Sequence, residues 1–309
     1  KSAEAPSLGQ VIIDMFPTNP ISAMAEGKTL QVIVFAVLFG IAISAAGKPG
    51  ERIAAVFADL NEVIMKLVAL LMNLAPYGVF FLMAKLFTGL GLSAILNLAE
   101  YFLVLAGTLV IHGLVTYSVM LKGFTGLSPI TFLKKMEDAI MFAFSTASSN
   151  ATIPVTMETA KNRMGVDNRI SSFTVPLGAT VNMDGTAIMQ GVATAFIAQA
   201  FNIDLTMGDY LMVIMTATLA SIGTAGVPGV GLVMLAMVLN QVGLPLEGIA
   251  LIMGVDRLLD MIRTAVNITG DSAVTVIVAK SEGALDESRF NDPMAGAKEE
   301  EVHLKKAEA

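Results

Sequence analysis

Long apolar segments alternate with short polar ones along the chain. Residues 30–47, roughly 58–86 and 102–121 are each long enough to cross the ~30 Å hydrocarbon core of a membrane as a helix, at ~1.5 Å per residue. Small and polar residues interrupt each of the later apolar segments, which are 136–160, 171–200 and 210–240. The pattern predicts an all-α membrane protein in which three spans precede broken helices.

The positions of lysine and arginine predict that two of the broken segments are re-entrant hairpins. Segment 136–160 has basic residues on both sides, whereas the loops beside 210–240 contain none. The basic residues in question are Lys122, Lys134, Lys135, Lys161, Arg163 and Arg169. Because such residues gather on the cytoplasmic side, we expect 136–160 to enter from the cytoplasm and 210–240 from outside. Arms of ~11 residues span ~16 Å, so the two tips should meet near the middle of the bilayer.

The tips of these segments have the composition of irregular backbone. They read "STASSNATIP" (145–154) and "SIGTAGVPGVG" (221–231), runs of small residues closed by proline. Irregular backbone at membrane depth is tolerated only where protein buries it or where it lines a cavity. The alternative is a close contact between helices rich in small residues.

A related polar motif follows each hairpin. "TVNMDGTA" (180–187) and "AVNITGDSA" (265–273) share Val-Asn-x-x-Gly, so the unit of hairpin plus helix occurs twice and enters from opposite sides. Inverted repeats of this kind place substrate and coupling-ion sites where the two repeats meet.

The last helix carries one polar face within an apolar segment. The residues of this face fall within about 100° of helical arc; they are Asp256, Asp260, Arg263, Thr264, Asn267 and Asp271. Ionisable residues at membrane depth cost ~2.5 to 3.5 kcal/mol each, so this face should point into the protein. Either it binds a ligand or it forms structural ion pairs, such as Asp260 with Arg263.

The donor types on this face indicate two kinds of ligand. Carboxylate, amide and carbonyl oxygens suit alkali or alkaline-earth cations, and sodium fits. The planar guanidinium of Arg263 suits a carboxylate, and Asp260 suits an ammonium group, so an acidic amino acid satisfies both.

Composition supports a membrane protein and excludes several other classes. The 309 residues are 55% hydrophobic and 15% charged, with a mean hydropathy of +0.72. The chain has no cysteine, and its two histidines, His112 and His303, are far apart in sequence, which excludes thiolate sites and a histidine cluster. A net charge of −7 with a polar, solvated-looking end speaks against nucleic acid as a partner.

Four motifs give the chain a family resemblance. "NMDGTA", "PLGAT", "SIGTAGVPGVG" and "DMIRTAVNITGD" closely resemble the dicarboxylate/amino acid:cation symporters, the glutamate transporter family that includes the excitatory amino acid transporters and their prokaryotic homologues. The resemblance runs from about Ser7 to Glu282. It implies a multi-pass protein of the cell membrane, plasma or inner, that forms a homotrimer and works as an elevator, with a transport domain sliding against a scaffold.

The resemblance also implies a division of the chain. The expected parts are a scaffold and trimerisation region with three spans (1–125), a transport domain (126–284) made of hairpin 1 (131–162), helix 7 (168–200), hairpin 2 (206–242) and helix 8 (247–280), and a polar cytoplasmic tail (285–309). Family members carry three further helices before the point where this sequence starts, and these supply ligands of a third sodium site.

Residue roles follow from the same resemblance. Asp260 would hold the substrate amino group, Arg263 its side-chain carboxylate, and Asn267 with Ser148 and Ser149 its main carboxylate. Thr186 and Thr264 would add hydrogen bonds, and Val227 and Gly231 would belong to the extracellular gate. One sodium site would use the carbonyls of Gly178, Asn182 and Asn267 with the Asp271 side chain; a second would use the carbonyls of Thr180, Ser221, Ile222 and Thr224; a third would use Asn182 and Asp184.

The expected function is therefore a symporter that couples sodium influx to uptake of aspartate or glutamate. Proton-coupled uptake of an acidic amino acid or dicarboxylate is the alternative, and a passive anion channel is the alternative from another class. Gln190 stands where potassium-countertransporting animal members have glutamate, so no potassium coupling is expected. An enzyme is not expected: "ITGD" lacks the first glycine of the intramembrane aspartyl protease signature, and neither hairpin contains histidine for a serine hydrolase.

Overall fold

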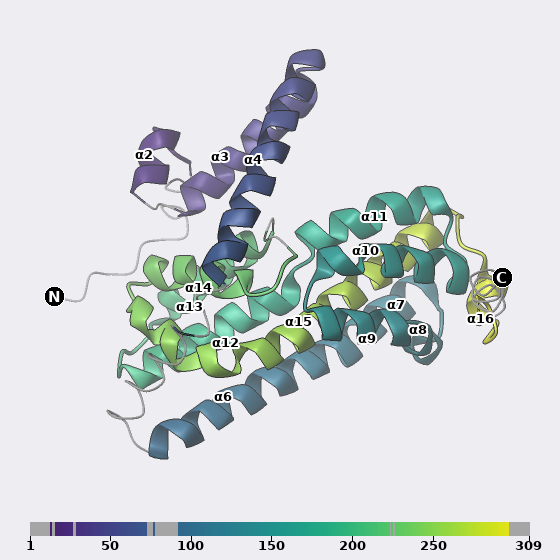
Figure 1. Cartoon of the computed structure of the whole chain (residues 1–309). Coiled ribbons are helices and arrows are strands. Elements are labelled where there is room, and N and C mark those ends of the chain that lie inside the picture. The colour runs from purple at the N-terminus through teal and green to yellow at the C-terminus, as the bar shows by residue number, and fades with distance from the viewer. Residues whose placement is uncertain are drawn as a thin grey trace. The chain divides into compact units, whose positions relative to one another are not determined.

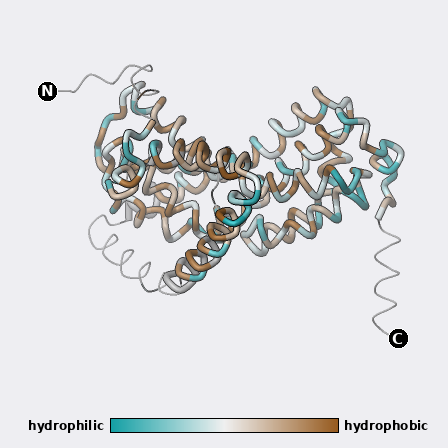
Figure 2. The backbone as a smooth tube through the Cα atoms, turned by 90° about the horizontal axis from the view of Figure 1, so that it is seen from above, coloured by the Kyte–Doolittle hydropathy of each residue, from teal (hydrophilic) through white to brown (hydrophobic). Residues whose placement is uncertain are grey.

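The computed structural model describes residues 13, 16–26, 29–72, 77, 92–222, 224 and 226–296 (Figure 1). Regular structure in these residues is helical throughout, and one isolated antiparallel bridge joins Val166 and Leu285. The predicted all-α class is confirmed. Apolar residues run along most of the described helices (Figure 2). The described helices are α2 (Pro20–Ala25), α3 (Thr29–Ala45), α4 (Lys48–Met72), α6 (Leu92–Ile111), α7 (Tyr117–Thr125), α8 (Pro129–Lys135), α9 (Glu137–Thr146), α10 (Ser149–Glu158), α11 (Asn168–Val181), α12 (Asp184–Ala200), α13 (Met207–Ser221), α14 (Val230–Gln241), α15 (Ile249–Ser281) and α16 (Glu287–Asn291), with π-helical turns η1 (His112–Thr116) and η2 (Thr159–Arg163) and a 3₁₀ turn η3 (Leu246–Gly248).

The chain forms two compact units. One consists of residues 1–99, 193–220 and 232–254, and the other of residues 100–192, 221–231 and 255–309. Residues 100–125 thus group with the hairpin tips rather than with 1–99. The units reflect packing and do not test membrane roles, so the division at residue 125 into scaffold and transport domain stays a prediction.

The predicted spans correspond to helices wherever the structure describes them. Helix α3 covers most of 30–47, while part of 58–86 lies outside the described residues. Within the described part of the chain, the helical stretch Leu98–Thr125 alone combines the length and the apolar character needed to cross a membrane. Shorter apolar helices cover Val34–Ala45, Met207–Ser221 and Val230–Gln241.

The first hairpin forms where the small residues predict it. Helices α9 and α10 pack against each other, and they are separated by Ala147 and Ser148 (Figure 1). Ala147 ends α9 in the left-handed region with φ of 50°, and the Ser148 hydroxyl caps α10 by accepting the Ala151 N–H at 3.2 Å. With α8 and η2, this helical hairpin occupies residues 129–163, close to the predicted 131–162.

The two related polar motifs differ in backbone structure. Asn182, at φ −96° and ψ 74°, ends α11, and α12 starts again at Asp184. The second motif lies inside the continuous helix α15, which agrees with the predicted helix 8 but has no break. Asn267 and Gly270 there are helical, and the Thr269 hydroxyl returns a hydrogen bond to the Ala265 carbonyl at 2.7 Å.

The second hairpin is formed by α13 and α14. Val213 and Ala217 of α13 pack with Val238 of α14 in a buried apolar cluster, which Val242 extends. The described part of its tip, Ile222, Thr224 and 226–229, connects the helices, as predicted for 206–242. Gly229, with φ of +81°, leads into α14 in a conformation that favours glycine.

The segment that follows α15 docks onto the base of the first hairpin. The Asp167 N–H donates to the Ala284 carbonyl at 3.0 Å, the Asp286 N–H donates to the Gly165 carbonyl at 2.8 Å, and Phe290 is completely buried. Asp286 caps α16, and hydrogen bonds from Ser288 and from the Arg289 N–H lower the pKa of its carboxyl. Phe290 supplies apolar surface to bury, which explains why the first residues of the predicted polar tail (285–309) dock; the cytoplasmic location of that tail stays a prediction. Residues 297–309 lie outside the described part of the chain.

Lys135 is the polar anchor of this docking. Its buried ammonium donates to three backbone carbonyls, those of Arg163 at 2.6 Å, Asp292 at 2.8 Å and Arg289 at 3.1 Å. Three separate segments therefore converge on one charge that is almost fully removed from solvent.

Replacing Lys135 with methionine is expected to destabilise the protein. The change keeps the apolar stem but leaves three carbonyls without their donor, at a cost of about 1 to 3 kcal/mol. The thermal unfolding midpoint of the purified protein should fall by at least ~2 °C. Lys134→Met is the matched control, since the neighbouring Lys134 is exposed. Equal midpoints for the two variants would contradict the anchoring role.

Candidate substrate and ion site

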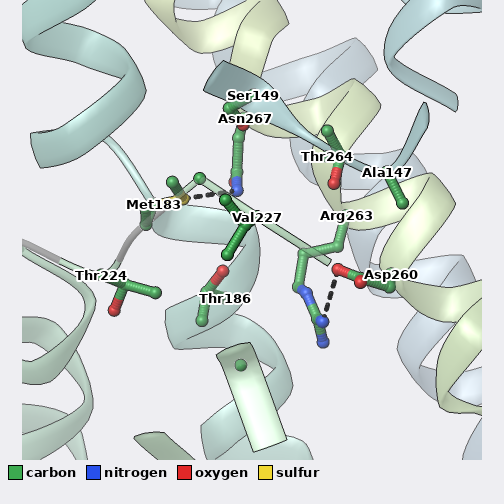
Figure 3. Close-up of a pocket in the computed structure, with 12 residues that line it drawn as sticks. Ala147, Ser149, Met183, Thr186, Thr224, Val227, Asp260, Arg263, Thr264 and Asn267 are labelled. Carbon is green, nitrogen blue, oxygen red and sulfur yellow. Dashed lines mark hydrogen bonds and ion pairs between the residues drawn. The ribbon is translucent and has the colours of Figure 1, made fainter. Parts of the chain in front are cut away.

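A small polar pocket lies where the two hairpin tips, the α11/α12 break and α15 converge (Figure 3). All of its lining belongs to one compact unit. Eight of the nine predicted substrate residues line it, and the ninth, Ser148, is buried at the adjoining tip. The lining residues are Ala147, Ser149, Met183, Thr186, Thr224, Gly226, Val227, Gly231, Asp260, Arg263, Thr264 and Asn267. The cavity of about 20 Å³ has room for about one water molecule and is too small for an amino acid.

Arg263 is held between two buried carboxylates. Its Nη2 lies 2.6 Å from Asp260 Oδ1 (Figure 3). Its Nη1 lies 3.4 Å from Asp256 Oδ1. All three side chains are less than a tenth exposed. The pairing of Asp260 with Arg263 is the structural ion pair that the sequence left open. It also leaves one charge unbalanced, because two carboxylates face one guanidinium.

The tip of the second hairpin is fastened on both sides of the pocket. The Gly229 N–H donates to Asp260 Oδ2 at 3.0 Å. On the other side, the Gly226 carbonyl accepts the Ser148 hydroxyl at 2.7 Å and the Asn150 N–H at 3.1 Å. The two tips are thus in direct contact, while their entry from opposite sides of a membrane and the role of the second tip as a gate stay predictions.

Asn267 lines the pocket, and two contacts hold its amide in place. Its Oδ1 accepts the Gly185 N–H at 2.8 Å, and its Nδ2 lies 3.2 Å from the Met183 sulfur (Figure 3). Thr186 and Thr264 are buried beside it. Sulfur is a weak acceptor, so a substrate oxygen in the pocket would accept a stronger hydrogen bond from the Asn267 amide than the Met183 sulfur does.

Gly231 brings the start of α14 close to the arginine. A Cβ added at Gly231 would lie 2.9 Å from Arg263 Nη2 and 3.0 Å from Met189 Cε. Replacing Gly231 with alanine should therefore displace the guanidinium and weaken aspartate binding by about 1 to 3 kcal/mol. Binding measured on Gly191→Ala serves as the control, because a Cβ at Gly191 meets no atom within 4 Å. The same affinity in both variants would show that this close approach is unimportant.

The residues predicted for the first sodium site lie together. Asn182 Nδ2 donates to Asp271 Oδ1 at 2.9 Å and to the Asn267 carbonyl at 3.2 Å, and Asp271 is 2% exposed. A Cβ on Gly178 would lie 2.6 Å from Asp271 Oδ1, so only glycine leaves room beside that carboxylate. Among the described residues, no three His, Cys, Asp or Glu side chains gather in a way that could hold a metal. The oxygens present nevertheless suit a sodium ion, for which carbonyls and a single carboxylate are fitting ligands.

For the other two predicted sodium sites, the structure shows local contacts of single residues. Ser221 is the last residue of α13, Ile222 and Thr224 follow it, and the Thr224 N–H donates to the Ser221 carbonyl at 3.2 Å. Thr180 lies in the last turn of α11, where its hydroxyl donates to the Leu177 carbonyl at 2.9 Å. Their gathering around one ion stays a prediction.

Asp184 has two partners that the sequence did not reveal. Its Oδ2 lies 2.7 Å from His112 Nε2 and accepts the Tyr117 hydroxyl, while its Oδ1 accepts the Gly185 N–H at 3.0 Å. His112 was set aside as isolated, since no other histidine or cysteine lies near it in sequence. The available signal was a histidine within an apolar span, where a polar side chain needs a partner.

Comparison with known proteins decides the family. The chain matches the model of the sodium:dicarboxylate symporter family over residues 1–281. It belongs to that family. The resemblance read from the motifs is thereby confirmed, and this is a family of membrane transporters, not of enzymes.

Three relatives of this family illustrate the range of transport it covers. The chain is 35% identical over 295 residues to the "Proton/sodium-glutamate symport protein" of Bacillus subtilis (strain 168), with 96% of this chain and 68% of the relative covered. It is 37% identical over 279 residues to the "Proton/glutamate-aspartate symporter" of Escherichia coli (strain K12), covering 90% and 63%, respectively. It is 38% identical over 293 residues to the "Excitatory amino acid transporter 4" of Mus musculus, covering 93% and 52%. The chain thus spans about half to two thirds of these relatives.

Proposed function

We propose that this chain forms the substrate-binding part of a secondary active symporter that takes up aspartate or glutamate together with sodium ions. The observation that carries the proposal is the buried pair of Arg263 and Asp260, 2.6 Å apart, in a small polar pocket between two hairpin tips. The names of the relatives, which include glutamate and aspartate symporters, support the same substrate class.

The pocket chemistry matches an acidic amino acid group by group. A substrate ammonium would take the place of Arg263 and Gly229 at Asp260, and a side-chain carboxylate would take the place of Asp260 at Arg263. The main carboxylate would meet Asn267 and the Ser149 tip. Each buried charge exchanges one partner for another and is never left alone, which keeps the desolvation penalty small.

Sodium coupling rests on the oxygen cluster around Asn182. A sodium ion there would be held by the Asp271 carboxylate and the unwound backbone at the α11/α12 break, and it would supply the positive charge that this buried carboxylate lacks. Relatives named for proton transport support the alternative, a proton-coupled symporter. A C4-dicarboxylate transport protein of Rhodospirillum rubrum, 38% identical over 288 residues, keeps a dicarboxylate substrate in consideration.

We also propose the membrane arrangement that the charge pattern favours. Helices α9 and α10, at 10 residues each, span ~15 Å, half of the hydrocarbon core, which supports re-entrant hairpins. Together with family membership, this supports an elevator-type transport domain and a homotrimer in the plasma or inner membrane. Irregular backbone at the tips is consistent with this depth because both tips line the buried pocket.

Counterflow in proteoliposomes tests the proposal. Proteoliposomes that contain the full-length protein and are loaded with unlabelled aspartate should accumulate labelled aspartate only when sodium is present on both sides of the membrane. Sodium-independent counterflow that instead responds to pH would favour the proton-coupled alternative. Passage of aspartate without accumulation under any imposed cation gradient would indicate a passive channel.

A further inference from the structure

We propose that His112 is a positioning residue for the coupling cation: it holds the Asp184 carboxylate in the orientation that binds the ion. This inference rests on the proposed sodium coupling and assigns a role to a residue of the helical run that precedes the first hairpin. Its basis is the contact of His112 Nε2 with Asp184 Oδ2 at 2.7 Å.

The backbone of this run is built to present two side chains to one carboxylate. His112 and Tyr117 are five positions apart, which in an α-helix turns them about 140° away from each other. The π-helical turn at 112–116 lies between α6 and α7 without interrupting the helix, since the flanking Ile111 and Tyr117 keep helical dihedral angles. One extra residue in the turn brings positions five apart onto the same side, and such turns occur frequently at functional sites.

The two rings stabilise each other in this arrangement. They lie edge to face, with centroids 4.9 Å apart and planes at 71°. Tyr117 is buried, and a Cβ added at Gly270 of α15 would approach both its hydroxyl and Asn182 Nδ2 at 2.5 Å. Only glycine at position 270 therefore lets the Tyr117 hydroxyl reach the residues of the predicted ion sites.

The hydrogen bonds leave Asp184 oriented but not saturated. An ionised carboxylate only accepts hydrogen bonds, so the Nε2 of His112 must carry the hydrogen in this contact. Oδ2 then has two donors, whereas Oδ1 accepts only the Gly185 N–H and keeps a lone pair for a further ligand such as a cation. Without His112, Oδ2 would keep only the Tyr117 hydroxyl as a donor, so the Asp184 side chain, 30% exposed, would be held less firmly in this orientation.

A sodium titration of three variants tests this role. His112→Leu removes the donor, His112→Gln keeps an N–H donor, and Tyr117→Phe removes only the second donor. The first readout is thermal stabilisation of the purified full-length protein by sodium chloride alone, with choline chloride as the reference salt. The second is the aspartate dissociation constant at saturating sodium. Val115→Ala is the matched control, because Val115 is exposed in the same π-helical turn.

We expect His112→Leu to raise the half-saturating sodium concentration about tenfold and to leave aspartate binding at saturating sodium unchanged. Tyr117→Phe should also raise the half-saturating sodium concentration. His112→Gln and Val115→Ala should keep that concentration within about twofold of the parent value. The inference is overturned if His112→Leu titrates like the parent, or if His112→Gln is impaired as much as His112→Leu. If His112→Leu does not fold, the inference is overturned by a Tyr117→Phe variant that titrates with sodium like the parent. A parent protein that does not respond to sodium would instead refute the proposed sodium coupling.

Discussion

Replacing Arg263 with threonine is expected to weaken aspartate binding by about 2 to 5 kcal/mol, which is ~30-fold to several thousandfold in the dissociation constant. Neutral amino acids should then compete better against aspartate. The reason is that the site keeps its contacts for the amine and the main carboxylate but loses the guanidinium that lies between Asp260 and Asp256. A second substrate carboxylate would then enter beside two carboxylates that have lost this partner.

The control for this change lies on the same helix. Arg257 is exposed on α15, so Arg257→Thr removes the same charge without touching the pocket. Competition by serine and by aspartate should be measured for both variants and the parent. If Arg263→Thr still preferred aspartate over serine by the parent ratio, the assignment of Arg263 to the side-chain carboxylate would be wrong. The ion pair with Asp260 would then be purely structural.

Changing Asp271 to asparagine is expected to raise the sodium concentration needed for aspartate binding at least tenfold. A unit charge ~4 Å from an ion contributes ~4 kcal/mol at an effective dielectric constant of about 20, and desolvation offsets part of this. The asparagine oxygen can still accept the hydrogen bond that Asn182 gives Asp271, so the fold should be retained. The change therefore removes the charge with little effect on shape.

Asp204→Asn is the control for this prediction, because Asp204 is exposed and lies far along the chain from the break between α11 and α12. Aspartate binding should be titrated with sodium in the parent and both variants. Unaltered sodium dependence in Asp271→Asn would remove Asp271 from the ion's coordination and would leave its burial without a charge partner to explain it.

Helical spacing alone was sufficient to predict the polar face of α15. Asp260, Arg263 and Asn267 recur at steps of three and four, and the structure places all three in the pocket. The first hairpin could be predicted equally well from the sequence, because small residues and proline mark its tip and basic residues mark its ends. In both cases the signal is local, since periodicity and composition act over a few residues.

Features that depend on contacts between distant segments could not be predicted in this way. The π-helical turn that brings His112 and Tyr117 together leaves no mark on hydrophobic periodicity, and Asp184 is 72 positions from His112. The docking of the segment after α15 was not predicted either, because its charged composition gives no sign that tertiary packing buries Phe290. The motifs at Asn182 and Asn267 look alike, yet only the first breaks its helix, where Asn182 bonds to α15.

The small size of the pocket also has a consequence for the proposed transport. A cavity of about 20 Å³ is too small for an amino acid, so we expect residues that line it to move when substrate binds. The bonds from Gly229 to Asp260 and from Ser148 to Gly226 hold that tip in place. We propose that substrate replaces the first of these bonds and thereby releases the tip, because conformational coupling requires a difference in contacts between states.

The central claim is that one site couples an acidic amino acid to sodium, and equilibrium binding tests it most directly. The dissociation constant of L-aspartate should be measured on the purified full-length protein over about a hundredfold range of sodium, with choline holding ionic strength constant. Linkage predicts that the dissociation constant of aspartate falls at least about tenfold for each tenfold rise in the sodium concentration, as long as sodium is below saturation. It also predicts that aspartate lowers the dissociation constant of sodium by the same factor. A dissociation constant that is the same at every sodium concentration would contradict the account.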